Sequence, residues 1–245
     1  VADSNYQGEC RSQPHAVTAV VDLDNITAVE TFVTATDADG ASATAQAMSI
    51  TFTGVTETTV QNITVDGSAV TDADDDLTFA ASAVTVATTS FTVTGGAGDD
   101  ILAGSNAADT ITGGTGTSDI LTITRDGTGD TALSATDLSA VTLIENFVVN
   151  GTTVAGSVTI ADANVADGKT LHIDGSSLTT GVLTAVLAAD SNGINTVTGG
   201  GAADLITGSG SDLGDTLTGG AGNDTFTFAT ANLTSLDTIS GGAGT

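Results

Sequence analysis

The chain has 245 residues, with 30 Asp and Glu against 3 Lys and Arg, for a formal net charge of −27. So few cations exclude a nucleic-acid partner, because phosphate recognition requires clustered Lys and Arg. They also leave the acidic side chains without enough partners for salt bridges, so bound divalent cations are the natural counter-charge. The single Cys excludes an internal disulfide, and no apolar run approaches the roughly 18 residues of a transmembrane helix.

Residues 1–14 differ from the rest of the chain, since they hold its single Cys, single Pro and single Tyr. We expect them to form an extended arm or cap. Beyond them the content of Thr and Val is high, and Val17, Ala19 and Val21 alternate with their neighbours as in a strand. Residues 15–94 are therefore predicted to form an irregular β-solenoid segment.

Glycine-rich segments of nine residues begin at Gly95. Gly95–Ala103 fits the template G-G-x-G-x-D-x-U-x, in which U is a large apolar residue. Two further copies keep the phase up to residue 121, although Asp119 falls one place late. The glycines permit positive-φ turns and bring carbonyl oxygens close together, and the aspartate supplies a hard oxygen that suits Ca²⁺. The sequence thus predicts a calcium β-roll cluster at 95–121.

A second Thr- and Val-rich segment, 122–189, is also predicted to be irregular β-solenoid. The best helix signal in it is Ser134–Leu143, where Asp137 could cap a short turn, but a surface turn is favoured. Gln61–Val70 resembles Glu145–Val154, and each stretch is followed by an acidic turn and then by a nonapeptide cluster. The sequence therefore contains an internal duplication of one module.

The second nonapeptide cluster spans 190–245. Gly219–Thr227 fits the full template, whereas the copy at 190–198 has Asn195 at the aspartate position and the copy at 208–218 carries extra residues. The last five residues are the head of one more copy. We therefore expect the sequence to be a fragment, or the ordered part, of a longer protein.

These repeats resemble those of the repeats-in-toxin (RTX) family of secreted calcium-binding proteins. The resemblance implies an all-β, right-handed parallel β-solenoid with RTX-type calcium β-roll segments. It also implies type I secretion to the cell exterior or cell surface, directed by a signal beyond Thr245. The segments between the clusters are similar, more loosely, to those of bacterial surface-layer (S-layer) members.

In such a roll two nonapeptides make one coil, and each tail points one apolar side chain inward. The predicted inward ladders are Leu102, Ile111 and Ile120 in the first cluster, and Val197, Ile206, Leu217, Phe226 and Ile239 in the second. A complete Ca²⁺ site needs two loops of one edge, from successive coils, so calcium binding is expected to be coupled to folding.

The candidate metal ligands are the repeat aspartates and the glycines whose carbonyls would approach the ion. They are Gly96, Gly98, Asp100, Asp109, Gly114, Gly116, Asp119, Gly200, Asp204, Asp215, Gly220, Gly222, Asp224 and Asp237. Asp99 and Asp212, the other members of acidic pairs, are less favoured. The alternative is that these loops are plain Asp-Gly turns without metal.

Other motifs are weaker. Asp72-x-Asp74-x-Asp76 resembles the start of an EF-hand loop but lacks its glycine and its final glutamate, so a solvated acidic turn is favoured. Asp37–Gly40 is treated in the same way. The metalloprotease motif H-E-x-x-H and the lipase motif G-x-S-x-G are absent, His15 and His172 are isolated, and Cys10 lacks a paired base. We expect no enzymatic activity in this chain.

The leading functional hypothesis is a secreted calcium-binding structural protein that assembles with itself into a surface layer or an extracellular filament. A cell-surface polysaccharide is a candidate second partner. The alternative is an accessory or secretion module of a larger exported enzyme, toxin or adhesin. A third hypothesis, ice or surface binding by a flat Thr face, is not favoured because pairs such as Thr122/Thr124 and Thr225/Thr227 are scattered along the sequence.

Overall fold

The computed structural model describes residues 17–22, 31–33, 47–53, 61–81, 84, 89–104, 109–124, 137–151, 153, 155–229 and 231–244. The predicted arm at 1–14, with Cys10, lies outside the described residues, as do His15 and the Asp37–Gly40 turn. Among the residues described, no helix is both long enough and apolar enough to cross a membrane.

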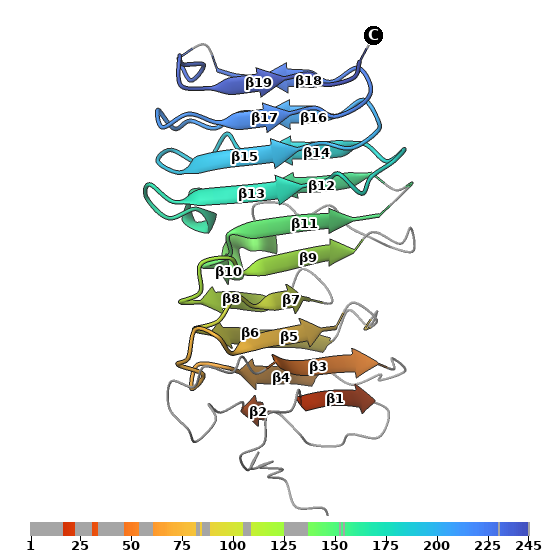
Figure 1. Ribbon diagram of the computed structural model, residues 1–245, viewed down its shortest axis with the longest axis vertical. Coiled ribbons are helices and arrows are strands. Elements are labelled where there is room, and N and C mark those ends of the chain that lie inside the picture. Colours follow the sequence, from red (N-terminus) through yellow and green to blue (C-terminus); the bar gives the residue numbers. More distant parts are fainter. Residues whose placement is uncertain are drawn as a thin grey trace, which may run out of the picture. The chain divides into compact units, whose positions relative to one another are not determined.

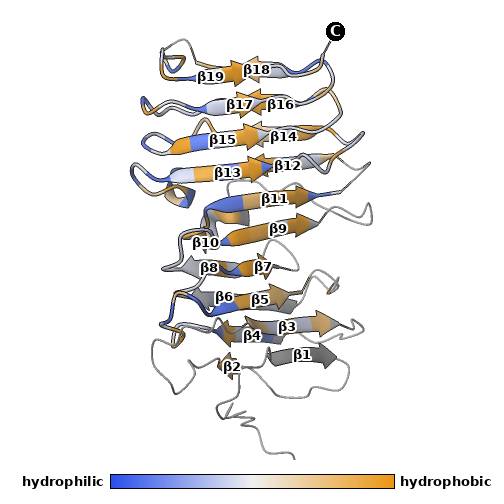
Figure 2. Cartoon of the chain, in the orientation of Figure 1, coloured by the Kyte–Doolittle hydropathy of each residue, from blue (hydrophilic) through white to orange (hydrophobic). Residues whose placement is uncertain are grey.

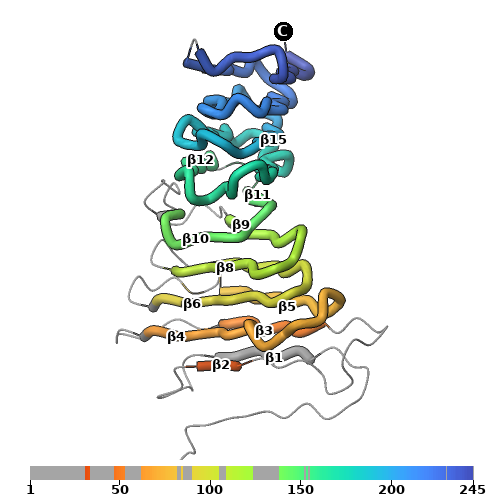
Figure 3. The backbone as a smooth tube through the Cα atoms, turned by 90° about the vertical axis from the view of Figure 1, so that its left-hand side faces the viewer, coloured from red at the N-terminus to blue at the C-terminus, as the bar shows by residue number. Residues whose placement is uncertain are grey.

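The chain divides into two compact units, Val1–Leu121 and Thr122–Thr245. Each unit holds one of the two similar stretches, 61–70 and 145–154, and in each stretch the aligned side chains point inward. Ile63 and Val65 are buried in the first unit, and Phe147 and Val149 are buried in the second. Figure 3 shows that the backbone of each unit runs in stacked coils.

The first unit consists of two parallel sheets whose strands alternate along the chain (Figure 1). Odd-numbered strands pair in the order β1-β3-β5-β7-β9, and even-numbered strands pair in the order β2-β4-β6-β8. The strands are β1 (Val17–Asp22), β2 (Thr31–Val33), β3 (Ala47–Thr53), β4 (Gln61–Asp66), β5 (Asp76–Ala80), β6 (Thr89–Gly96), β7 (Ile101–Ala103), β8 (Thr110–Gly114) and β9 (Ile120–Thr124).

The second unit repeats this arrangement, with sheets β11-β13-β15-β17-β19 and β12-β14-β16-β18. Its elements are η2 (Asp137–Ala140), β10 (Val141–Thr142), β11 (Asn146–Asn150), β12 (Gly156–Thr159), η3 (Asp162–Asn164), β13 (Thr170–Asp174), β14 (Leu183–Val186), β15 (Ile194–Thr198), β16 (Leu205–Thr207), β17 (Thr216–Thr218), β18 (Thr225–Thr227) and β19 (Thr238–Ser240). The predicted all-β parallel solenoid is confirmed.

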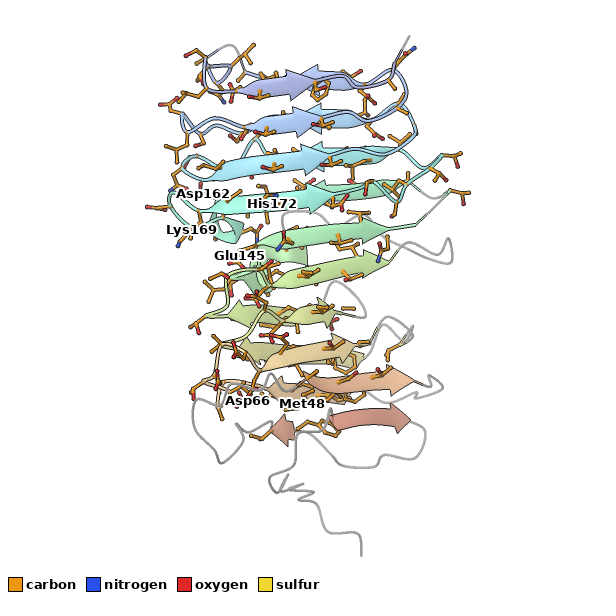
Figure 4. All side chains as sticks on the ribbon, in the orientation of Figure 1. Met48, Asp66, Glu145, Asp162, Lys169 and His172 are labelled. Carbon is orange, nitrogen blue, oxygen red and sulfur yellow. The ribbon has the colours of Figure 1, made fainter. Side chains whose placement is uncertain are left out.

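Alternation along each strand makes the core. Apolar residues at every second position face inward, while Thr and Ser face outward. Figure 2 shows the hydrophobic colouring gathered in the strands, and Figure 4 shows the side chains on the ribbon. In the first unit the wide coils are filled by Phe52, Phe79 and Phe91, whose ring centroids lie 5.0–5.9 Å apart. The nonapeptide coils instead bury mainly aliphatic side chains such as Leu102, Ile206 and Leu217.

The predicted ladder of the first cluster is right at two positions and wrong at the third. Leu102 and Ile111 are buried, but the next inward residue is Leu121 rather than Ile120. Leu121 pairs with Leu102, whereas Ile120 pairs with the exposed Ile101 on the outer surface. The loop before Asp119 has one extra residue, so the strand that follows is displaced by one position. A displacement by one position turns every side chain of a strand to the opposite face of the sheet.

In the second cluster Val197, Ile206 and Leu217 are buried as predicted. Phe226 and Ile239 continue the two ladders in register, opposite Ile206 and Leu217 respectively. They are more exposed, with Ile239 at 41%, because they belong to the last strands that the structure describes.

The candidate helix at Ser134–Leu143 is a short 3₁₀ helix, η2, where a surface turn was favoured; residues 134–136 lie outside the described residues. Leu138 is fully buried, so the segment is not wholly on the surface. Asn164 Nδ2 donates hydrogen bonds to the carbonyls of Leu138 and Val141, at 2.8 and 2.9 Å. These bonds satisfy carbonyls that the end of a short helix leaves without partners.

Candidate calcium-binding loops

The loops that follow β15, β17 and β19 lie one above another on one side of the second unit, at the right in Figure 1. We call loops 199–204, 219–224 and 241–244 the glycine edge of this unit. Backbone hydrogen bonds join each loop to the next: Ala221 N donates to Gly200 O at 2.8 Å, and Ala243 N donates to Gly220 O at 2.7 Å. The loops are therefore stacked in register, as calcium binding between coils requires.

Glycine is required where these loops touch. Gly220 and Gly222 have φ values of 101° and 103°, in the left-handed region. A Cβ at Gly220 would overlap the carbonyl oxygen of Gly200, and a Cβ at Gly222 would overlap that of Ala202. Only glycine lets the next loop approach these carbonyls so closely.

The aspartates that end loops 199–204 and 219–224 turn their carboxylates inward. Asp204 is buried, its Oδ1 accepts a hydrogen bond from Leu183 N of the preceding coil, and its Oδ2 accepts one from Gly200 N of its own loop, both at 2.7 Å. Asp224 Oδ1 accepts from Asp204 N at 2.9 Å. Asp224 Oδ2 is buried and has no hydrogen-bond partner among the described residues. A buried anionic oxygen without a donor is costly unless a cation meets it.

The first unit has the same construction in loops 95–100 and 113–119, with Asp100 and Asp119 at the loop ends. Asp100 accepts from Leu77 N and Gly96 N, both at 2.7 Å. Asp119 Oδ1 accepts from Asp100 N at 2.8 Å, as Asp224 does from Asp204. Although Asp119 falls one place late in the sequence, it holds the equivalent place in the structure.

The predicted glycine ligands of the first unit are stacked in the same way. A Cβ at Gly114 would overlap Gly96 O, and one at Gly116 would overlap Gly98 O. Gly98 itself lies against the carbonyl of Asp75, from the coil before. These contacts bring carbonyl oxygens of one loop against the backbone of the next, and we call loops 95–100 and 113–119 the glycine edge of the first unit.

Burial changes the acidity of two of these aspartates. Desolvation raises the pKa of Asp100 to about 6, against the opposing effect of hydrogen bonds from Leu77 and Gly96, and with a smaller upward contribution from Asp76 and Asp99. Desolvation likewise raises the pKa of Asp204. In both cases burial disfavours the ionised carboxylate, so a bound cation would stabilise it.

Three of the predicted aspartate ligands lie away from these glycine loops. Asp109 lies on the other side of the first unit, after β7, and accepts from Phe91 N at 2.9 Å. Asp215 and Asp237 lie on the other side of the second unit, where we call loops 187–193, 208–215 and 231–237 the serine edge. Asp237 Oδ1 accepts from Asp215 N at 2.7 Å, so this edge is stacked in register too.

The weaker acidic motifs form turns. Asp74 N donates to Asp72 Oδ1 at 3.3 Å, while Asp76 Oδ1 accepts from Asp99 N at 3.0 Å. Asp99 is exposed and caps the next loop by accepting from Thr117 N at 2.9 Å; Asp212 is exposed. In the described part of the chain no three His, Cys, Asp or Glu side chains are grouped so that they could hold a metal ion.

The glycine edges fit Ca²⁺ through a different donor set. Calcium takes six to eight oxygen ligands in flexible geometry and accepts backbone carbonyls as readily as carboxylates. Each glycine edge offers carbonyls from two successive loops with one aspartate from each loop. Such a set needs no cluster of three acidic side chains.

Comparison with protein families identifies these loops. A family model of the RTX calcium-binding nonapeptide repeat matches four copies, at residues 92–120 and 190–226. The chain contains RTX nonapeptide repeats. The matched ranges make up about a quarter of the chain and cover both glycine edges as far as Phe226. Searches of curated proteins and of solved structures found no match.

The sequence did not indicate two features of these sites. One is that the repeat aspartates accept backbone N–H groups from the preceding coil, which follows only from the stacking. The other is the polar group around Asp190 and Asn195, which are both buried. The sequence shows Asn195 only as a substitution at the aspartate position.

Proposed function

We propose that this chain is an exported structural protein in which Ca²⁺ binds between the stacked loops of the glycine edges and so holds the coils together. The observation that carries the proposal is the buried Asp224 Oδ2, which has no hydrogen-bond partner among the described residues and lies in a loop whose glycines lie against carbonyl oxygens of the preceding coil. RTX repeats in general bind Ca²⁺ and occur in type I secreted proteins, which supports export.

In each unit, two successive loops of the glycine edge would hold a Ca²⁺ ion between them. Carbonyls of Gly96, Gly98, Gly114, Gly116, Gly200, Gly220 and Gly222, with Asp100, Asp119, Asp204 and Asp224, are the proposed ligands. The bound ion supplies positive charge between acidic loops, in a chain with a net charge of −27. No catalytic step is proposed.

The test is far-UV circular dichroism during titration with EGTA at neutral pH. We expect part of the β structure to be lost on chelation and to return with Ca²⁺, because a metal site formed only in the folded state couples binding to folding. Mg²⁺ should restore it poorly, since Mg²⁺ favours octahedral, partly hydrated sites. An unchanged spectrum at full chelation would contradict the proposal.

A matched pair of variants separates ligands from ordinary turns. Asp224→Ala removes the proposed ligand, and we expect at least a tenfold loss of calcium affinity by calorimetry, about 1.4 kcal/mol. Asp174→Ala removes an Asp-Gly corner outside the repeats, where Asp174 Oδ1 accepts only from Ser176 N at 2.9 Å. Equal effects of the two variants would count against the assignment.

We further propose that the exported protein assembles with itself into a surface layer or extracellular filament, with Ca²⁺ controlling the contacts. The charge supports this, because acidic subunits approach one another only when cations lie between them.

A further inference from the structure

The serine edge differs from the glycine edge at the position of the repeat aspartate. Asn195 stands there and is buried. Its Nδ2 donates to Asp190 Oδ2 at 2.6 Å and to Asp215 Oδ1 at 3.3 Å. Asp190 and Asp215 belong to successive loops and are both buried. One neutral amide group therefore joins the carboxylates of two coils.

Every oxygen of these two carboxylates has a donor. Asp190 Oδ1 accepts from Gly193 N at 3.0 Å, and Asp215 Oδ2 accepts from Ser209 N at 2.8 Å. Ser209 Oγ donates to Asp215 Oδ1 at 3.1 Å. On the glycine edge, by contrast, Asp224 Oδ2 is buried without a donor. The serine edge thus lacks the unsatisfied anionic oxygen that calls for a cation.

The amide is oriented to serve as a donor. No donor among the residues that the structure describes reaches the buried Asn195 Oδ1, so the side chain satisfies two carboxylates while its own acceptor is unused. A buried acceptor without a partner has a cost. The contacts with Asp190 and Asp215 offset that cost, because hydrogen bonds to charged groups are the stronger kind.

Serines replace the glycines that would present carbonyls. In loop 208–215 the second and fourth template positions are Ser209 and Ser211, both buried. Ser209 Oγ accepts from Ser211 N, and Ser211 Oγ accepts from Leu213 N, each at 3.2 Å. The loop therefore satisfies its own backbone amides with hydroxyl groups.

We infer that Asn195 takes the place of calcium on the serine edge, so that this edge stays closed without metal and only the glycine edge of the unit depends on Ca²⁺. The inference rests on the proposed calcium binding by the glycine edge. It makes Asn195 a positioning residue that determines which edge is selective for calcium, and it removes Asp215 from the candidate ligands.

Hydrogen exchange of the full chain, with Ca²⁺ and with EGTA at pH 7.5, tests this. On chelation we expect exchange to accelerate in 199–204 and 219–224 at least tenfold more than in 187–193 and 208–215. Equal acceleration at both edges overturns the inference and leaves the proposed function standing. If neither edge responds to chelation, both are overturned.

Two variants of Asn195 make the test sharper. Asn195→Asp removes the donor and adds a third buried carboxylate, so exchange at 208–215 should become fast in EGTA and slow again in Ca²⁺. Asn195→Ala removes the donor without adding charge, so exchange there should be fast in both conditions. Calcium rescue of the Asp variant alone supports the inference, whereas rescue of neither or of both overturns it.

Discussion

Each repeat aspartate joins neighbouring coils before any metal is considered. Asp100 and Asp204 accept backbone N–H groups from the preceding coil, and Asp237 accepts from Asp215 N. The carboxylate thus serves as a backbone acceptor, which explains why it is turned inward and buried. The same burial makes its charge costly, because few cations are available in this chain.

Protonation of the buried carboxylates should therefore stabilise the calcium-free protein in part. The pKa of Asp100 is raised by burial from 3.8 to about 6. The folded, metal-free state thus binds this proton more tightly than the unfolded state does, so the group's contribution to stability is fully present below 3.8 and is lost as pH rises through about 6. We expect calcium-free protein to gain β structure, by circular dichroism, as pH falls from 7 to 4.5.

The variant Asp100→Asn provides the control. It resembles the protonated carboxyl in shape and carries no charge, so the calcium-free variant should show a weaker dependence on pH than the parent chain. A loss of β structure on acidification, or an identical pH profile for the two proteins, would contradict this prediction.

Strand pairing in the nonapeptide coils depends on loop length. β7 and β9 are short, and the pairing of Leu102 with Leu121 shows that the extra residue in loop 113–119 is absorbed before the strand begins. Asp119 and Leu121 both shift by one position. The apolar residue that follows the aspartate by two places faces inward in both coils, so the aspartate is a better guide to register than the glycines.

A pair of alanine variants tests this register. Leu121→Ala should cost about 2–5 kcal/mol of unfolding free energy, since it leaves a cavity in the ladder. Ile120→Ala should cost clearly less, because Ile120 pairs on the outer surface with Ile101. Urea unfolding of the calcium-loaded proteins is the measurement. A larger loss for Ile120→Ala would show that the register is wrong.

The chain as a whole combines coils of two kinds. Wide coils bury large side chains such as Phe79 in the first unit and Phe147 in the second, while the nonapeptide coils bury little. The wide coils have a hydrophobic core of their own, whereas the stability of the nonapeptide coils depends on the interactions between their stacked loops. The charge is concentrated in Asp-rich turns, and the strands present mostly neutral Thr and Ser to the outside.

Self-assembly of the chain should consequently depend on the calcium concentration. We expect ordered sheets or fibres of the full chain at about millimolar Ca²⁺ and dispersal on chelation, because divalent ions lie between acidic surfaces while they also close the loops. Light scattering and negative-stain images across a calcium series measure this. Monovalent salt at equal ionic strength, the control, should not replace calcium. A chain that stays monomeric at every calcium level would favour the accessory-module hypothesis.

The nonapeptide template by itself determined the repeat phase, the parallel solenoid and most of the inward residues, because glycine, aspartate and apolar positions at a fixed spacing have one compact solution. Which loops face one another was decided only by the tertiary structure. Coils of different length place Thr196, Thr216 and Thr238 in one row, although such Thr pairs are scattered in the sequence. The stacking of the coils also makes the two aspartates different: Asp224 has an oxygen without a partner among the described residues, whereas the oxygens of Asp215 accept from Asn195 and Ser209. Hydrogen-bond partners about 20 residues apart depend on stacking, which no local pattern contains.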